Sequence, residues 1–207
     1  MSVHLVDHPL AHDALVELRD ATTKIAAFRR AAARLSLLLA VEALRDVPSS
    51  SVVVQTLLGL SPGRRASSDV VVVPVLRAGL GMLDAVLEIV PSARVGFIGL
   101  KRDEATAVAS QYYANLPPDM EASYVLLLDP MLATGGSAAT ALDLIKRTGA
   151  KTVRMICIVA APPGVAEVGR RHPDVQIYTP AIDPELNSKN YIVPGLGDSG
   201  DRLFGTV

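Results

Sequence analysis

The spacing of apolar residues changes once along the chain. From residue 10 to residue 46, apolar side chains recur every three or four positions, as at Leu35 and Leu39, which is the spacing of an amphipathic helix. We therefore predict a helical N-terminal segment over residues 1–48. Its longest helix should cover residues 22–46, because a proline follows and ends it.

Beyond this segment, short continuous apolar runs alternate with helical patterns. Such runs are typical of strands buried on both faces of a parallel sheet, and the helices between them cover those faces. We predict a single α/β domain over residues 1–207, with a mostly parallel sheet flanked by helices. The predicted strands are 69–77, 93–100, 123–129, 151–161 and 174–180, and the predicted helices are 79–90, 137–150 and 162–173.

Two further segments do not follow this alternation. Residues 101–122 are polar and weakly patterned, and we interpret them as a flexible excursion, a protruding loop or hairpin able to move over a binding site. Residues 190–207 contain four glycines together with Tyr191 and Phe204. A floppy tail would rarely combine these residues, so we expect this C-terminal segment to be an ordered part of the fold.

The composition argues against several classes of function. The formal net charge is -1, and aromatic residues make up 4% of the chain, which disfavours a broad nucleic-acid-binding face. The lone cysteine, Cys157, allows no disulfide within the chain and is expected to be a small buried residue. The N-terminus does not have the pattern of a signal peptide, and the longest apolar stretch is too short and too charged to cross a membrane. We expect a cytoplasmic protein without nucleic-acid or membrane partners.

The loop after the third predicted strand, residues 129–137, has the composition of an anion site. Its glycines let backbone N–H groups approach an anion, and the helix that follows directs the positive end of its dipole at the loop. Thr134 and Ser137 add hydroxyl donors, whereas the carboxylate of Asp129 suits ribose hydroxyls better than a phosphate. The loop therefore predicts a site for a sugar and its phosphate together. The alternative is a tight turn into a helix that a Ser or Thr side chain caps.

Two arginines lie at or just beyond the ends of predicted strands. Arg77 ends the first strand and Arg102 follows the second. Ligands of parallel sheets bind beyond the carboxyl ends of the strands, so we expect both arginines near Asp129 at one edge. A guanidinium group binds phosphate oxygens in pairs and stays charged. For either arginine alone, the alternative is an exposed ion pair.

The stretch VLLLDPMLATGGSA (125–138) resembles the motif with which type I phosphoribosyltransferases bind 5-phospho-α-D-ribose 1-diphosphate (PRPP). Most of that group carry two adjacent acids at the strand end. Here Pro130 replaces the second acid, as it does in the uracil branch of the group. Three further stretches resemble the same branch, so the resemblance covers essentially the whole chain. They are VPVLRAGLGM (73–82), VGFIGLKRDE (95–104) and YIVPGLGDSGDRLFG (191–205).

The resemblance implies how PRPP would be held. Arg77 and Arg102 would grip its diphosphate and, with Asp129, would be the catalytic residues. Asp198 would contact PRPP through the diphosphate or through a Mg²⁺ ion, which PRPP itself would mainly hold. The cradle for the ribose 5-phosphate would consist of Asp129, Pro130, Met131, Leu132, Ala133, Thr134, Gly135, Gly136 and Ser137.

The resemblance also implies that the C-terminal segment, residues 190–207, is a hood over uracil. Turns with little side-chain bulk can present backbone N–H and C=O groups to the carbonyls and the N3–H of the base at close range. The same groups would mismatch the exocyclic amine of cytosine, and mismatched buried polar groups discriminate strongly. The implied uracil contacts are Ile192, Gly197, Asp198 and Ser199.

The implied activity is the transfer of a phosphoribosyl group from PRPP to uracil, which yields UMP and diphosphate in pyrimidine salvage. Members of the group are often homodimers or higher homo-oligomers, and some respond to GTP as an effector. Three alternatives stay open. They are a phosphoribosyltransferase for another base such as a purine, an RNA-binding pyrimidine regulator on the same fold, and a protein that senses PRPP without catalysis.

Some features depart from the pattern of the group or point elsewhere. The stretch EATAVASQYY (104–113) lacks the usual proline, and Val41 stands at a position that is often tyrosine. The sequence GDSG at 197–200 also occurs around the nucleophile of chymotrypsin-like serine proteases, which would require a histidine base. We expect Ser199 to be a turn residue instead. The histidines fall in no recognisable motif and are expected at the surface or as caps: they are His4, His8, His12 and His172.

Overall fold

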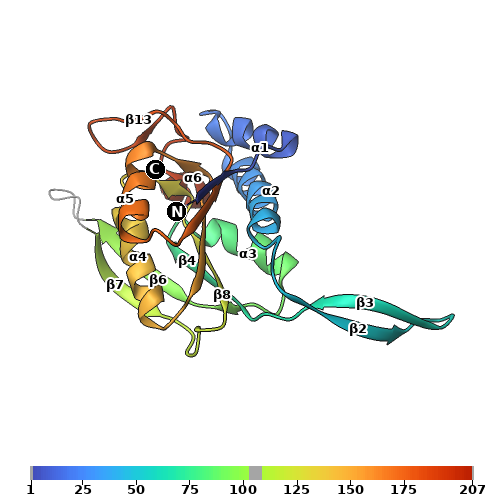
Figure 1. The fold of residues 1–207 in the computed structure, drawn as a ribbon. Coiled ribbons are helices and arrows are strands. Elements are labelled where there is room, and N and C mark those ends of the chain that lie inside the picture. Colours follow the sequence, from blue (N-terminus) through green and yellow to red (C-terminus); the bar gives the residue numbers. More distant parts are fainter. Residues whose placement is uncertain (1, 103–108, 207) are drawn as a thin grey trace.

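The computed structural model describes residues 2–102 and 109–206. Its centre is an eight-stranded sheet in which all neighbouring strands are parallel except β6 and β7, which are antiparallel (Figure 1). This confirms the predicted fold class. The strand order is β1 (Ser2–Leu5), β12 (Gln176–Thr179), β10 (Thr152–Ile156), β8 (Tyr124–Leu128), β4 (Val70–Leu76), β6 (Phe97–Arg102) and β7 (Ala109–Asn115), with β5 (Arg94–Val95) also paired to β4.

Helices cover both faces of the sheet (Figure 1). Alternate residues of the central strands point to opposite faces, so Val72 and Leu126 belong to one core cluster while Val73 and Leu127 belong to the other. This explains why these strands are continuous apolar runs. The first cluster packs against α1 (Pro9–Arg19), α2 (Ile25–Ala43) and α3 (Leu80–Ile89), and the second against α4 (Gly136–Arg147) and α5 (Pro162–Arg171).

Two predicted strands are broken in the structure. The predicted strand 93–100 is divided into β5 and β6 at Gly96, whose N–H donates to the carbonyl of Val72 at 3.0 Å. The predicted strand 151–161 is divided as well, because β10 ends at Ile156. The N–H groups of Ile158 and Val159 both donate to the carbonyl of Pro130, at 3.0 and 3.1 Å, and so leave the ladder of the main sheet. The chain then continues as β11 (Val159–Ala160), which pairs with β9 (Met131–Leu132) in a separate small sheet.

The structure contains a β-hairpin that the sequence patterns did not predict. Strands β2 (Ser49–Gln55) and β3 (Leu60–Ala66) pair antiparallel along their whole length and extend away from the rest of the fold (Figure 1). We call residues 49–66 the β2–β3 arm. The edge strand β1 was also missed, within a segment expected to be helical.

The excursion expected at residues 101–122 includes a hairpin. Strand β7 returns antiparallel to β6, with Arg102 opposite Ala109. The segment between these two residues lies outside the described part of the chain, and it includes residues 104–108, the first half of the stretch that lacks the usual proline.

The C-terminal segment packs on the N-terminal helices. After the short strands β13 (Glu185–Leu186) and β14 (Ile192–Val193), it ends in helix α6 (Ser199–Phe204). The guanidinium of Arg202 lies 4.3 Å from the centroid of the Phe28 ring on α2, and Nε of Arg29 donates to the carbonyl of Leu203 at 2.7 Å. The segment is therefore an ordered part of the fold, as expected. In the described residues, no helix has the length and apolar character needed to span a membrane.

Candidate active site

The carboxyl ends of three adjacent parallel strands bring the predicted polar residues to one edge of the sheet. Arg77 follows β4, Arg102 ends β6 and Asp129 follows β8. Strand β4 lies between the other two and is parallel to both, so these ends meet as predicted. For Arg102 this placement concerns the backbone, because its side chain lies outside the described part of the structure.

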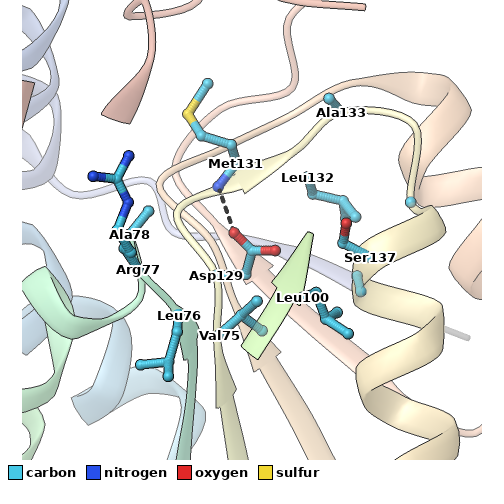
Figure 2. Close-up of a pocket in the computed structure, with 12 residues that line it drawn as sticks. Val75, Leu76, Arg77, Ala78, Leu100, Asp129, Met131, Leu132, Ala133 and Ser137 are labelled. Carbon is cyan, nitrogen blue, oxygen red and sulfur yellow. Dashed lines mark hydrogen bonds between the residues drawn. The ribbon is translucent and has the colours of Figure 1, made fainter. Parts of the chain in front are cut away.

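A cavity of about 210 Å³ opens at this edge. Figure 2 shows the side chains of Arg77 and Asp129 beside it, with the start of α4 across from them. The structure thus joins the predicted diphosphate residue Arg77 to most of the predicted cradle in one concave space. The lining residues are Val75, Leu76, Arg77, Ala78, Leu100, Asp129, Met131, Leu132, Ala133, Gly135, Ser137 and Ala138.

The segment around Asp129 is fixed by backbone hydrogen bonds. The N–H of Asp129 donates to the carbonyl of Ile156 at 3.2 Å, and its Oδ1 accepts the N–H of Met131 at 3.4 Å. Pro130 is buried, and its carbonyl accepts the two N–H groups that end β10. The proline therefore ties the loop to the neighbouring strand, while the half-buried carboxylate of Asp129 remains at the cavity wall.

The loop enters α4 through a glycine that no other residue could easily replace. Gly135 has a φ of +83°, and a Cβ at this position would lie 2.8 Å from the carbonyl oxygen of Gly164. Gly135 is also the N-cap of α4, so the cap residue has no side chain with which to cap the helix. The alternative of a turn capped by a Ser or Thr side chain is therefore wrong. A helix leaves its first N–H groups unbonded within itself, and Ser137 and Ala138 in the first turn of α4 line the cavity.

The hood lies beside Arg77 and not in the wall of the cavity. Oδ1 of Asp198, the N-cap of α6, accepts the N–H of Asp201 at 2.9 Å. Asp201 in turn approaches Arg77, with 3.3 Å between Oδ1 and Nη2. A Cβ on Gly200 would lie 3.8 Å from the Cβ of Ala78, so the start of α6 packs directly on the loop after β4.

The sequence model of the uracil phosphoribosyltransferase family matches residues 5–206. The chain belongs to this family. A uracil phosphoribosyltransferase from Dictyoglomus turgidum is 48% identical over 205 residues, which cover 99% of either chain. The solved structure of the AQ2163 protein from Aquifex aeolicus superimposes with a TM-score of 0.93 at 37% identity, over 98% of this chain and 97% of that one.

The fold is also that of more distant phosphoribosyltransferases. A hypoxanthine-guanine phosphoribosyltransferase from Bacillus anthracis has a TM-score of 0.52 at 14% identity, covering 76% of this chain and 80% of its own. At this identity the likeness concerns the fold alone. Family and fold both confirm the resemblance that the motifs indicated.

Family membership and geometry together remove the serine protease alternative. Ser199 begins α6 and is buried, and its Oγ has no hydrogen-bond partner among the described residues, a histidine included. His8 caps α1 by accepting the N–H of Leu10 at 3.1 Å, as expected of a capping histidine. His172 is the C-cap of α5, which is also one of the expected positions, and it is buried, with Nε2 3.1 Å from the carbonyl oxygen of Ala139.

Cys157 is buried as expected. Burial raises the pKa of its thiol to about 12. The thiolate is the nucleophilic form of cysteine, so this side chain packs in the core and takes no part in chemistry at neutral pH.

The structure adds three polar residues that the sequence patterns did not single out. Asp201 contacts Arg77, and its position three residues after the cap Asp198 was a signal that could have found it. Arg19 and Asp183 form an ion pair below the hood although they lie far apart in sequence. Neither belongs to a local motif, so no pattern in the sequence pointed to them.

Proposed function

We propose that the chain transfers the phosphoribosyl group of PRPP to N1 of uracil, forming UMP and diphosphate. The observation that carries this proposal is the cavity in which Arg77, Asp129 and the glycine loop before α4 meet at one edge of a parallel sheet. The family match over residues 5–206 supports uracil as the base.

The ribose 5-phosphate would lie in the loop from Asp129 to Ser137. The phosphate is suited to the N terminus of α4, where backbone N–H groups and the helix dipole favour negative charge. The Asp129 carboxylate, at the other end of the loop, is suited to accept hydrogen bonds from the ribose hydroxyls. Pro130 has no N–H, and its carbonyl accepts the N–H groups of Ile158 and Val159. The backbone donors to the phosphate would therefore come from residue 131 onward.

The diphosphate would lie against Arg77 and Arg102. The Arg77 side chain is more than half exposed at the cavity rim, where its guanidinium can bind two phosphate oxygens at once. Arg102 would approach from the end of the neighbouring strand β6.

The residues present fit a Mg²⁺ ion carried by the diphosphate. Within the described residues no group of three or more His, Cys, Asp or Glu side chains could hold a metal ion alone. Mg²⁺ commonly keeps several waters and binds one or two carboxylates together with substrate phosphates, and Asp198 would supply such a carboxylate through water. When bound, the ion neutralises charge on the diphosphate.

Uracil would be recognised by the hood through backbone groups of Ile192 and of Gly197 to Ser199. Ile192 is buried and Gly197 has a φ of +79°, so this turn can place main-chain N–H and C=O groups close to a flat base. The start of α6 lies next to Ala78, the residue after Arg77. This supports a base that is held next to the proposed diphosphate site.

In the reaction, N1 of uracil forms a bond to C1 of the ribose while the bond from C1 to the diphosphate oxygen breaks with its electron pair. The N1 proton passes to water. Positive charge develops on the ribose ring and negative charge on the diphosphate, so Asp129 and the two arginines would stabilise the transition state from opposite sides. Positioning of both substrates would supply much of the remaining acceleration.

A steady-state assay with PRPP and Mg²⁺ tests this function. We expect UMP formation with uracil, and no nucleotide formation with cytosine, hypoxanthine or guanine. Turnover of a purine in preference to uracil would show that the base is wrong. PRPP binding without any turnover would show a sensor in place of an enzyme, and salt-dependent retention of RNA on a filter would favour the RNA-binding alternative.

We further propose that the chain is a homo-oligomer that joins through the β2–β3 arm. The arm extends from the fold (Figure 1), and Leu57, Leu58 and Leu60 at its tip are 103%, 100% and 75% exposed. A two-stranded hairpin has little stability of its own in water, and a cluster of exposed apolar side chains usually marks a protein interface. A second copy of the chain would cover these residues.

Size-exclusion chromatography with light scattering tests whether the β2–β3 arm forms the interface between copies of the chain. We expect the wild-type protein to elute as a dimer or larger, and the double variant Leu57→Ser, Leu58→Ser to elute as a smaller species. Val16→Ser is the matched control, because Val16 is an exposed apolar residue on α1. An unchanged mass of the double variant would exclude the arm as the interface.

The family resemblance also predicts GTP as an effector and the cytoplasm as the location. The first prediction is tested by repeating the assay with GTP over a range of uracil concentrations, with ATP as the control nucleotide. A GTP-dependent change in KM or kcat is the expected result.

A further inference from the structure

A partly buried ion pair lies beneath the turn that separates the two groups of proposed uracil contacts. Arg19, the last residue of α1, donates from Nη1 to Oδ2 and from Nη2 to Oδ1 of Asp183, both at 2.7 Å. The Asp183 side chain is only 7% exposed. Such two-pronged, charge-assisted pairs fix orientation as well as position.

The pair holds both backbone groups of Gly195. The N–H of Gly195 donates to Oδ2 of Asp183 at 2.8 Å, and its carbonyl accepts Nη1 of Arg19 at 2.9 Å. Gly195 has a φ of +57°, and a Cβ there would lie 2.1 Å from the carbonyl oxygen of Ile192. The conformation of this turn is therefore set by the ion pair and permitted by the glycine.

The ion pair is anchored to the rigid part of the fold on two sides. The N–H of Asp183 donates to the carbonyl of Ala160 at 2.8 Å, which joins it to the end of β11. Arg202 reinforces the other side: its Nη1 donates to the carbonyls of Leu196, at 2.8 Å, and of Leu18 near the end of α1. The end of α1 thus holds two successive residues of the hood: Arg19 bonds Gly195 directly, and Leu18 is linked to Leu196 through Arg202.

We infer that Arg19 and Asp183 are positioning residues for uracil recognition. The inference rests on the proposed function, which places the base between Ile192 and the segment 197–199. Gly195 lies between these contacts, so the ion pair sets their separation and the direction of their backbone groups. Neither residue lines the cavity of Arg77 and Asp129, so the loss of the pair disturbs the uracil site and leaves Arg77, Asp129 and the loop before α4 in place.

Steady-state kinetics of Arg19→Gln test this role. We expect the KM for uracil to rise about tenfold, the order of effect when one charge-assisted hydrogen bond is lost, with the KM for PRPP close to the wild-type value. Arg34→Gln is the matched control, because Arg34 on α2 forms ion pairs with Asp13 and Glu17 of α1. In the described structure its side-chain hydrogen bonds go to these two residues and not to residues 190–206. It should leave both KM values unchanged.

Arg19→Lys provides the second variant, in case Arg19→Gln does not fold. Lysine keeps the charge but cannot bind both carboxylate oxygens and a carbonyl in one plane, so its KM for uracil should lie between those of wild type and Arg19→Gln. Equal rises in both KM values, or a folded variant with an unchanged KM for uracil, would overturn the positioning role. An inactive wild type would instead overturn the proposed function, so the two failures are distinguishable.

Discussion

Arg77 and Asp201 join the diphosphate side of the site to the hood. The two residues are 124 positions apart in the sequence, yet Nη2 of Arg77 lies 3.3 Å from Oδ1 of Asp201. Asp201 also accepts the hydroxyl of Thr206 at 2.5 Å, and its N–H is capped by Asp198. The first turn of α6 therefore orients an arginine that would bind one substrate, while the residues just before it would bind the other.

Asp201→Ala should reduce activity more than stability. The Arg77 side chain is 56% exposed, so the ion pair should contribute less than about 1 kcal/mol to the free energy of unfolding. Without its partner the guanidinium is less well oriented, and kcat/KM for PRPP should fall roughly tenfold. Urea unfolding and initial rates measure the two effects. Asp13→Ala, which removes an exposed partner of Arg34, is the control. A loss of stability that matched the loss of rate would contradict an orienting role.

Asp129→Asn should lower kcat on uracil by about a hundredfold, the scale on which the removal of one preorganised electrostatic contact acts in other active sites. The amide keeps the size of the side chain but loses the charge that would balance the ribose cation. Glu121→Gln, which alters an exposed ion pair with Lys151, is the control in the same assay. Turnover near the wild-type rate in Asp129→Asn would show that the carboxylate does not have this role.

Gly135→Ala should disrupt the cradle. A side chain at a φ of +83° is strained, and its Cβ would contact Gly164 at 2.8 Å, so we expect a loss of roughly 1 kcal/mol or more in stability together with weaker PRPP binding. Gly59→Ala is the matched control, because a Cβ on Gly59 would meet nothing within 4 Å. Thermal unfolding and calorimetric titration with PRPP and Mg²⁺ give the two quantities. Equal behaviour of the two variants would contradict the requirement for glycine.

Ser199→Ala should stabilise the protein. The hydroxyl is buried without a hydrogen-bond partner in the described structure, and such a group costs roughly 1–3 kcal/mol. The proposed contact of this residue with uracil uses its backbone, which the substitution keeps. A higher midpoint of urea denaturation is the expected result, with Ser36→Ala as the control, since that buried hydroxyl donates to the carbonyl of Ala32 at 2.7 Å. A lower midpoint of urea denaturation for Ser199→Ala would show that the hydroxyl has a hydrogen-bond partner after all.

The cradle could be predicted from the sequence because its determinants are local. An apolar strand, an acid at its end and glycines before a helix specify a loop of this kind within one short stretch of sequence, whatever the rest of the fold. The β2–β3 arm could not be predicted in this way. Its apolar residues, such as Leu57, do not face a core, and Pro62 and Gly63 in β3 are unusual in strands.

The contacts that hold the hood in place also could not be predicted from the sequence. Arg19 and Asp183 are separated by 164 positions, and each alone resembles any surface charge. They meet only in the folded chain, where Arg19 at the end of α1 reaches Asp183, whose N–H donates to the carbonyl of Ala160 in β11. Local patterns thus located the residues that would touch the substrates, whereas the residues that hold them in place depend on tertiary structure.

The ion pair beneath the hood predicts how stability depends on pH. Burial alone would raise the pKa of Asp183, but the hydrogen bonds and charge of Arg19, with the N–H of Gly195, outweigh burial and lower this pKa. A carboxyl whose pKa is lower in the folded state than in the unfolded state adds stability above its unfolded pKa, near 4, and loses that contribution as pH falls through the folded value. The contribution is therefore complete at neutral pH.

Asp183→Asn should consequently be less stable than wild type at pH 7, and the difference should shrink as the pH falls below about 4. At neutral pH the variant leaves the Arg19 guanidinium without its carboxylate in a partly buried site, so a loss of about 3 kcal/mol is expected there. Urea unfolding at pH 7, 5 and 3.5 measures the difference. Asp13→Asn is the control, because its carboxylate is exposed and its partner Arg34 stays in water; it should change stability little at any of these pH values. A difference for Asp183→Asn that stayed constant, or grew, on acidification would contradict a lowered pKa for this carboxyl.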